Sequence, residues 1–132
     1  MYFLKITFYI SNPILFLFYL YPGSILGCII INDCDTQPQI LNQSNFLSFN
    51  HLLIFFILSI LGLVSFPESF KKTMTYLIVI SIFLEFAQMI VPIRSFEFVD
   101  LISNLIGIVI AVVIYKILNI WRFKNRNVNN IL

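Results

Sequence analysis

Charged side chains are scarce in this 132-residue chain, because Asp, Glu, Lys and Arg together make up 11% of it and there is a single His. Soluble domains carry about 25% charged residues, so the composition argues against a globule surrounded by water. One His and no cluster of ligating side chains predict that the chain binds no metal ion. The sequence also lacks a nucleophile motif, a Gly-rich phosphate loop and a basic patch, so we expect no cofactor and no nucleic-acid partner.

Apolar residues are abundant instead, at 60% of the chain with 15 Phe and 6 Tyr, and this content excludes a disordered protein. Four segments have the roughly 20 mainly apolar residues that cross a hydrocarbon core of ~30 Å, namely 3–21, 49–66, 73–91 and 101–120. None shows the strict two-residue alternation of a membrane β-strand. We therefore predict an all-α polytopic membrane protein. Its fold is a four-transmembrane-helix bundle in a single domain over residues 1–124, followed by a short disordered tail over 125–132.

The distribution of Lys and Arg predicts the orientation of this bundle. In a four-span topology all but one of these residues lie on the same side of the membrane, namely Lys5, Lys71, Lys72, Lys116, Arg122, Lys124 and Arg126. Arg94 alone lies on the opposite side. Lys and Arg accumulate in cytoplasmic segments, so the charged side is expected to be the cytoplasm. We expect a multi-pass protein of the cell membrane (plasma or inner membrane) with both termini cytoplasmic.

The segment after the first span carries several features of an external loop. A Pro-Gly pair at 22–23 ends or kinks the first helix, and residues 24–31 either continue it or lie at the membrane interface. Cys28 and Cys34 lie on the outer face, where they either form a disulfide or stay as two unpaired small residues. The run that ends at Cys28 resembles a lipoprotein signal, but bulky Leu26 and the Pro-Gly break favour an uncleaved chain.

Polar residues interrupt the third span on one helix face. At about 100° per residue, Ser81, Glu85 and Gln88 fall close together around the helix. A lone carboxylate inside a membrane costs a few kcal/mol, so Glu85 is expected to face protein or water rather than lipid. It precedes Val91 by six residues, which places it ~9 Å below the outer end of the span at 1.5 Å per residue.

The fourth span carries polar and small residues on one face. Asp100, Asn104, Gly107 and Ala111 follow the spacing of a single helix stripe, polar at its outer end and small deeper in the membrane. Gly107 and Ala111 have the four-residue spacing that lets two helix backbones approach closely. We expect this small-residue face to pack against the third span.

Residues from three spans and one loop are thus predicted to meet at the same depth. We expect a single outward-facing cavity lined by His51, Glu85, Gln88, Arg94, Asp100 and Asn104. Glu85, Asp100 and His51 are the candidates for acid or base chemistry, and the other three are the candidates for ligand binding. A structural alternative stays open at this point. In it Asp100 caps the fourth helix, Arg94 pairs with Glu85 or Asp100, and Asn104 joins Gln88 between helices.

The order of these residues resembles a known family. His51, then Glu85-x-x-Gln88, Arg94 and Asp100-x-x-x-Asn104-x-x-Gly107, is similar to the VanZ-like family of small multispan membrane proteins over about residues 49–118. Members usually carry an Asp-Lys pair just before the His of the second span, where this chain has Leu47 and Ser48. The resemblance implies a cell-envelope protein, and the family's namesake is associated with resistance to the lipoglycopeptide teicoplanin.

Three functions are compatible with these observations. The first is an envelope protein that binds or modifies a lipid-linked or headgroup ligand, with membrane lipids as its partners. The second is a non-catalytic accessory subunit that uses its small-residue helix face to bind a larger envelope enzyme. The third is a small proton-coupled transporter with Glu85 as its titrating site. Transporter sites usually lie near the midplane, whereas this cluster is predicted near one face, which favours the first two.

Overall fold

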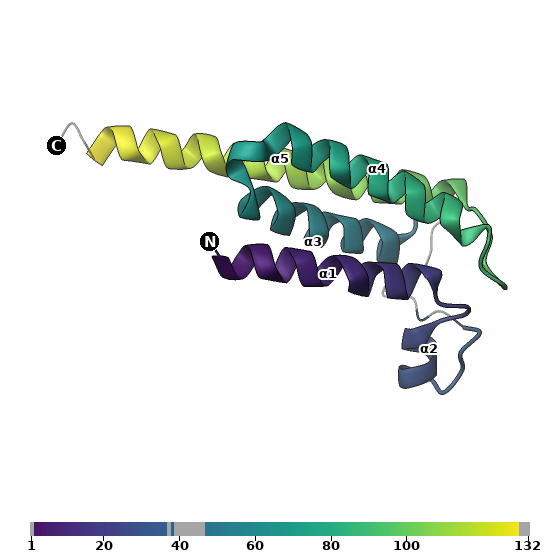
Figure 1. The fold of residues 1–132 in the computed structure, drawn as a ribbon. Helices are drawn as coiled ribbons and strands as arrows, with labels where there is room; N and C mark the ends of the chain where they lie inside the picture. The colour runs from purple at the N-terminus through teal and green to yellow at the C-terminus, as the bar shows by residue number, and fades with distance from the viewer. Residues whose placement is uncertain (1, 37, 39–46, 130–132) are drawn as a thin grey trace.

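The computed structural model describes residues 2–36, 38 and 47–129, with residues 122–129 described by their backbone alone. Regular structure in this part of the chain is helical, so the predicted all-α class is confirmed. The helices are α1 (Tyr2–Leu20), α2 (Ile25–Ile30), α3 (Phe49–Ser65), α4 (Phe70–Gln88) and α5 (Phe98–Asn129), and a 3-10 turn, η1 (Pro67–Ser69), joins α3 to α4. The long helices α1, α3, α4 and α5 lie side by side, and α2 lies beyond one end of them (Figure 1).

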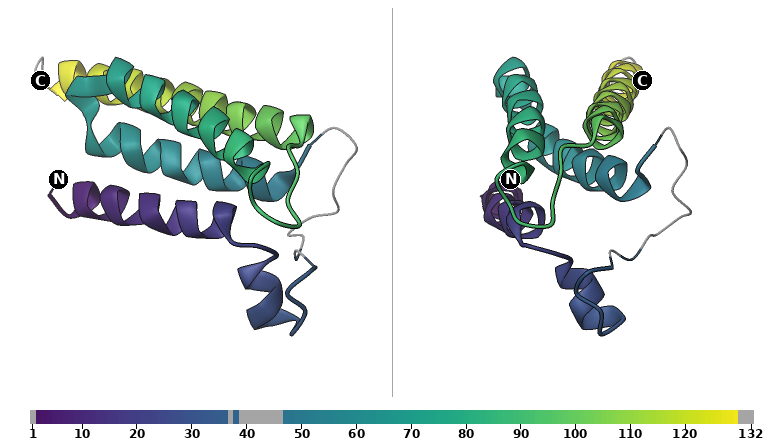
Figure 2. Two further views of the ribbon diagram at one scale, coloured as in Figure 1. Left: turned by 45° about the vertical axis from the view of Figure 1, so that its right-hand side comes forward. Right: turned by 90° about the vertical axis from the view of Figure 1, so that its right-hand side faces the viewer.

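The long helices run between two distinct ends of the bundle. The N-terminus and the α3–α4 turn lie at one end, and α5 continues past them (Figure 1). At the opposite end α1 and α4 finish, α3 and α5 begin, and α2 is attached (Figure 2). We call this the α2 end. Every helix terminus that the sequence predicts to face outward therefore belongs to one end of the molecule.

Apolar length supports more than one membrane crossing. Tyr2–Leu20 and Phe98–Trp121 are each long and apolar enough to span a bilayer. Phe49–Ser65 and Pro67–Gln88 meet this requirement together, as a pair bent by 108° at their junction, which makes two to three candidate spans in the described part of the chain. The prediction of a membrane protein with several apolar helices is confirmed, and the count of four spans stays a prediction.

The last helix is longer than the sequence analysis predicts. α5 continues to Asn129, past the expected end at residue 120 and into the segment 125–132 that was expected to be a disordered tail. No Gly or Pro follows Gly107, so the chain lacks the usual signals that stop a helix. Residues 130–132 lie outside the described part of the chain.

α3 and α5 approach each other closely at Gly107. A Cβ atom added to Gly107 would collide with the Leu52 carbonyl oxygen and lie 3.0 Å from the Phe56 nitrogen. Ala111, one turn further along α5, is fully buried. The small-residue face was expected to pack against the third span, now α4, and this expectation is wrong. Small-residue spacing identifies a surface for close packing, but it carries no information about which helix occupies it.

The interior of the bundle is apolar at its centre, and much of its outside is apolar as well. The core is formed by Phe8, Leu15, Tyr19, Phe55, Leu58, Leu77, Ile80, Leu84 and Ile108. Large apolar side chains on the outer faces of the helices, such as Ile57, Val79 and Val109, are more than half exposed. An apolar exterior on all four long helices is typical of a protein solvated by lipid chains.

Substituting Gly107 by leucine tests the α3–α5 contact. We expect Gly107→Leu to lower the free energy of unfolding by about 3 kcal/mol, because a side chain cannot fit against the Leu52 carbonyl without a backbone shift. Thermal unfolding in mild detergent measures the effect. Val109→Leu, on the exposed face of the same helix, is the matched control and should unfold like the wild type. Equal unfolding temperatures for Gly107→Leu and the wild type would contradict this packing.

Candidate functional site

The six residues predicted to meet all belong to the α2 end of the bundle. His51 lies in the first turn of α3, Glu85 and Gln88 in the last turn of α4, and Asp100 and Asn104 in the first two turns of α5. Arg94 lies in the connection between α4 and α5, residues 89–97. The order of helix ends therefore gathers residues that are up to 53 positions apart in the chain, from His51 to Asn104.

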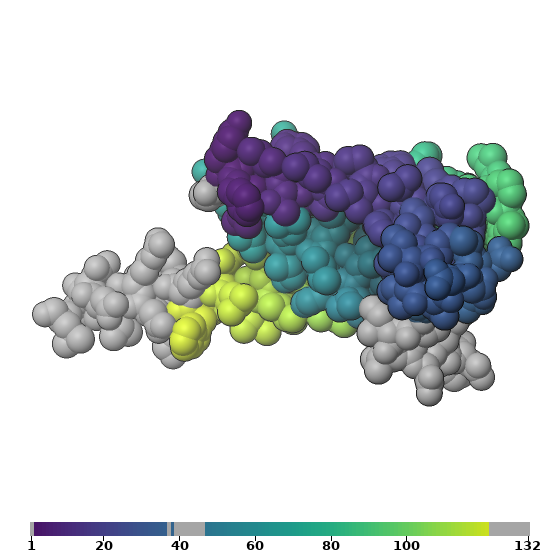
Figure 3. Space-filling view, turned by 90° about the horizontal axis from the view of Figure 1, so that it is seen from below, coloured from purple at the N-terminus to yellow at the C-terminus, as the bar shows by residue number. Residues whose placement is uncertain are grey.

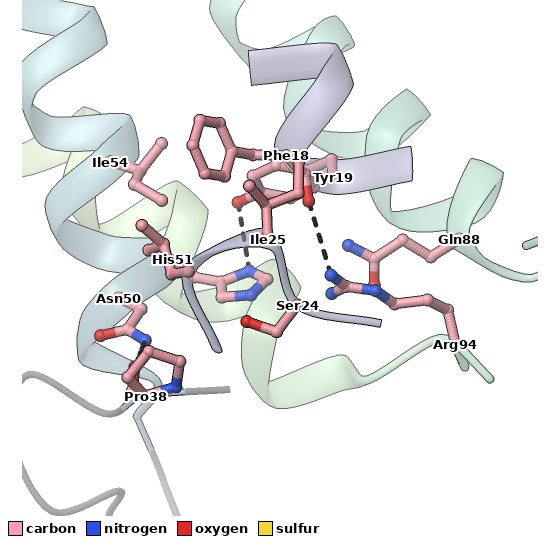
Figure 4. Close-up of a pocket in the computed structure, with 11 residues that line it drawn as sticks. Phe18, Tyr19, Ser24, Ile25, Pro38, Asn50, His51, Ile54, Gln88 and Arg94 are labelled. Atoms are coloured by element: carbon pink, nitrogen blue, oxygen red, sulfur yellow. Dashed lines mark hydrogen bonds between the residues drawn. The ribbon is translucent and has the colours of Figure 1, made fainter. Parts of the chain in front are cut away.

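A buried chain of polar contacts ties three helices together at this end. Nε2 of His51 lies 3.3 Å from Oδ2 of Asp100. On the opposite side of the ring, Nδ1 of His51 lies 3.1 Å from the hydroxyl of Tyr19, as Figure 4 shows. The same hydroxyl donates to Oδ1 of Asn104 at 3.0 Å. Tyr19, His51 and Asn104 are each at most 5% exposed, so the contacts are shielded from solvent.

The hydroxyl of Tyr19 determines which atoms of His51 carry protons. A phenol has a single proton, and Tyr19 donates it to Asn104. The contact between Tyr19 and His51 then needs a proton on Nδ1 of His51. Nε2 is left facing Oδ2 of Asp100. Both ring nitrogens of His51 are therefore engaged within the protein.

Tyr19 is a part of the site that the sequence analysis missed. A signal was present, because Phe8, Leu15 and Tyr19 have the spacing of one helix stripe, and all three are buried. A tyrosine on a buried stripe needs a partner for its hydroxyl, and this requirement points to a polar cluster beside the first span.

Arg94 binds the end of α1 rather than a carboxylate. Its Nη2 donates to the carbonyl oxygens of Gly23 at 2.6 Å and Phe18 at 3.4 Å. A cation is favourable here, because the last carbonyl groups of a helix carry partial negative charge. Among the residues that the structure describes, the one ion pair joins His51 to Asp100. The structural alternative in which Arg94 pairs with Glu85 or Asp100 is therefore wrong.

Several polar atoms at the α2 end are buried without a hydrogen-bond partner among the described residues. They are Oε2 of Glu85, Nε2 of Gln88, Oδ1 of Asp100 and Nδ2 of Asn104. The alternative in which Asn104 bonds to Gln88 is wrong, since neither amide nitrogen has a partner.

Asp100 does not cap α5, because one of its oxygens faces His51 and the other is unpartnered. Glu85 is fully buried, and its Oε1 accepts from the Glu97 amide at 3.2 Å.

Two cavities flank Arg94 and Gln88, which contribute to the walls of both. The first, which we call the inner cavity, has a volume of about 150 Å³ and is lined by Phe18, Tyr19, Ser24, Ile25, Leu26, Pro38, Asn50, His51, Ile54, Gln88 and Arg94 (Figure 4). The second, the acidic cavity, has about 160 Å³ and is lined by Gly23, Ser24, Asp35, Gln88, Ile93, Arg94, Ser95, Glu97 and Asp100. Of the six predicted residues, His51, Gln88, Arg94 and Asp100 thus line at least one cavity, and Glu85 and Asn104 line neither.

A disulfide shapes the segment beside these cavities. Cys28 and Cys34 are bonded to each other, so the pairing that the sequence left open is present. The Ser24 amide donates to the Cys34 carbonyl at 2.6 Å, which holds this segment against the end of α1. The Thr36 hydroxyl and the Asp35 amide donate to Asp33 and hold the pKa of that carboxyl below its ordinary value. Within the described residues, no three Cys, His, Asp or Glu side chains gather in a way that would hold a metal ion.

Comparison with known proteins assigns the family. No match was found among curated proteins or among solved structures. A family model described as VanZ/LLP1 matches residues 5–119, which run from the first turn of α1 to the membrane-spanning part of α5. The match includes all six residues that were predicted from the motif order. The chain therefore belongs to the VanZ/LLP1 family.

Proposed function

We propose that this protein crosses the cell membrane four times and uses the α2 end to bind the anionic headgroup of a lipid or lipid-linked molecule at the outer face. The observation that carries the proposal is the environment of Arg94. Its guanidinium has no acidic partner among the described residues and lines both cavities. A guanidinium binds phosphate or carboxylate oxygens through two parallel hydrogen bonds. Within the described part of the chain, Arg94 uses only Nη2 in hydrogen bonds.

Unpartnered donors support the same ligand chemistry. Nε2 of Gln88 is buried beside Arg94 without a described partner, and Gln88 also lines both cavities. Leaving a buried donor unsatisfied costs about 1–3 kcal/mol, which a headgroup oxygen bound at this position would offset. Arg94 and Gln88 together supply the donors that a phosphate group requires.

The candidates for acid or base chemistry differ in their access to a ligand. His51 has both ring nitrogens engaged, so we assign it a positioning role. Oδ1 of Asp100 is unpartnered, and Asp100 lines the acidic cavity, which makes it the group best placed to exchange a proton with a bound headgroup. Glu85 lies behind the cavities and contacts the α4–α5 connection through Glu97. A binding protein needs Arg94 and Gln88, and an enzyme would need Asp100 as well.

The small-residue face that the accessory-subunit alternative requires is not exposed for binding another protein. Gly107 and Ala111 are buried within the chain, and the backbone of α3 lies directly against Gly107. An accessory role would need another surface, and no observation on the described residues favours one. Headgroup binding therefore remains the function that we propose.

The four-span topology rests on helix direction and charge. α1, α3, α4 and α5 run between the same two ends of the bundle, and the described lysines Lys5, Lys71, Lys72 and Lys116 belong to the end opposite α2. α3 has 17 residues and α4 has 19, so their lengths are ~26 and ~28 Å at 1.5 Å per residue. A bilayer adapts to a span a few Å shorter than its hydrocarbon core. The positive-inside rule then places both termini in the cytoplasm.

Cysteine labelling tests this topology. A membrane-impermeant maleimide should label Ser95→Cys, in the α4–α5 connection, when applied to intact cells. Glu68→Cys, in the α3–α4 turn, should react only after the cells are permeabilised. Both positions are exposed on the protein surface, and the wild type, whose two cysteines form a disulfide, gives the background. Labelling of both variants from outside would rule out the proposed topology.

Neutralising Arg94 tests headgroup binding. We expect Arg94→Gln to weaken the binding of phosphatidylglycerol about tenfold, because a charge-assisted hydrogen bond contributes ~1.5–3 kcal/mol. The glutamine amide still reaches toward the α1 carbonyl groups, which favours retention of the fold. Native mass spectrometry of the purified protein measures the bound lipid. Lys116→Gln, an exposed cation at the opposite end, is the matched control and should bind like the wild type. Equal binding by Arg94→Gln and Lys116→Gln would remove Arg94 from the site.

A further inference from the structure

An apolar groove runs along the outside of the bundle between α1 and α3. Figure 3 looks onto this face, where α1 (purple) and α3 (teal) lie side by side and α2 (blue) crosses one end. The groove has a volume of about 330 Å³, and its walls include Ile14 and Phe18 on α1 and Ile54 and Ile57 on α3. Ser11 is its one polar lining residue, and the Ser11 hydroxyl donates to the Phe8 carbonyl at 2.8 Å. The groove therefore offers a ligand apolar contacts only.

This groove adjoins the inner cavity. Phe18, Leu26 and Ile54 line both of them, so the two spaces share a wall on each of three helices. The inner cavity lies at the α2 end, and the groove leads from it toward the middle of the bundle along α1 and α3. From Phe18 back to Ser11 the groove follows α1 for seven residues, or ~10 Å. An apolar groove parallel to α1 and α3 thus lies next to a polar compartment.

The polar compartment that the groove adjoins favours a negative charge. Arg94 lines the inner cavity, whereas its described lining residues include no carboxylate. Asp35, Glu97 and Asp100 all lie on the wall of the acidic cavity instead. A ligand with one anionic group and one apolar chain matches this arrangement, with the anion beside Arg94 and the chain between α1 and α3.

We propose that the α1–α3 groove holds one acyl chain of an anionic phospholipid whose phosphate group binds Arg94 in the inner cavity. This inference rests on the proposed headgroup site and adds the class of ligand and its direction of entry. The lipid enters sideways from the outer leaflet, because Ile14 and Ile57 on the groove walls are about half exposed on the outside of the bundle. Arg94 binds the phosphate group, and packing of the chain against the groove walls adds to the affinity for the whole lipid.

Filling the groove with a large side chain tests the inference. We expect Ile57→Trp to weaken the binding of phosphatidylglycerol about tenfold in native mass spectrometry of the purified full-length protein, because the indole occupies the place of the chain. Val79→Trp is the matched control, since Val79 is 59% exposed on α4 and Ile57 is 56% exposed on α3. Val79→Trp should bind phosphatidylglycerol like the wild type. Binding of glycerol 3-phosphate, which has the headgroup but no chain, should be unchanged in Ile57→Trp.

The outcomes separate the groove from the headgroup site. Unchanged phosphatidylglycerol binding in Ile57→Trp, together with a loss in Arg94→Gln, would overturn the groove and leave the proposed function standing. Unchanged binding in both variants would overturn both. If Ile57→Trp does not accumulate, Ile14→Trp on the opposite wall gives the same test. A phosphatidylglycerol with a photoreactive group in its chain should label α1 and α3 of the wild type, and labelling confined to α4 would also overturn the groove.

Discussion

The contact between His51 and Asp100 is the constraint on which the α2 end of this protein depends. Carboxylate and imidazole groups are costly inside a membrane unless each has a partner. Here the two groups satisfy each other at 3.3 Å, and Tyr19 satisfies the second nitrogen of His51. Since Tyr19 also bonds to Asn104, α1, α3 and α5 are fixed relative to one another at the α2 end. Residues of this network also line the cavities, Tyr19 and His51 the inner cavity and Asp100 the acidic cavity.

Close packing between α3 and α5 brings His51 and Asp100 within contact distance. α3 and α5 both begin at the α2 end and run in the same direction (Figure 1). The absence of a side chain at Gly107 lets the α5 backbone lie directly against the Leu52 carbonyl, one residue after His51. The separation of the two helix axes is thereby small where His51 and Asp100 face each other. Gly107 and Asp100, on the same stripe of α5, therefore both attach this helix to α3.

The distribution of charge around Arg94 decides what the α2 end can bind. Its guanidinium stabilises the carbonyl end of α1 and separates two cavities of similar size but different character. The carboxylates Asp35, Glu97 and Asp100 line one cavity. The other combines Arg94 with apolar walls, three residues of which also line the α1–α3 groove. The disulfide between Cys28 and Cys34 holds the segment that carries Asp35 beside the end of α1.

Local patterns in the chain are sufficient to predict the helical class, the membrane environment, the family, and the residues that gather at one end. Hydropathy and helix spacing are properties of neighbouring residues, so they can be determined from the sequence without a structure. The partners of those residues are not local. That Arg94 binds the end of α1, that Gly107 packs on α3 and that Tyr19 completes the polar cluster all depend on which helices become neighbours. Side-chain spacing on one helix carries no information about the helix opposite, because that choice results from the packing of the whole bundle.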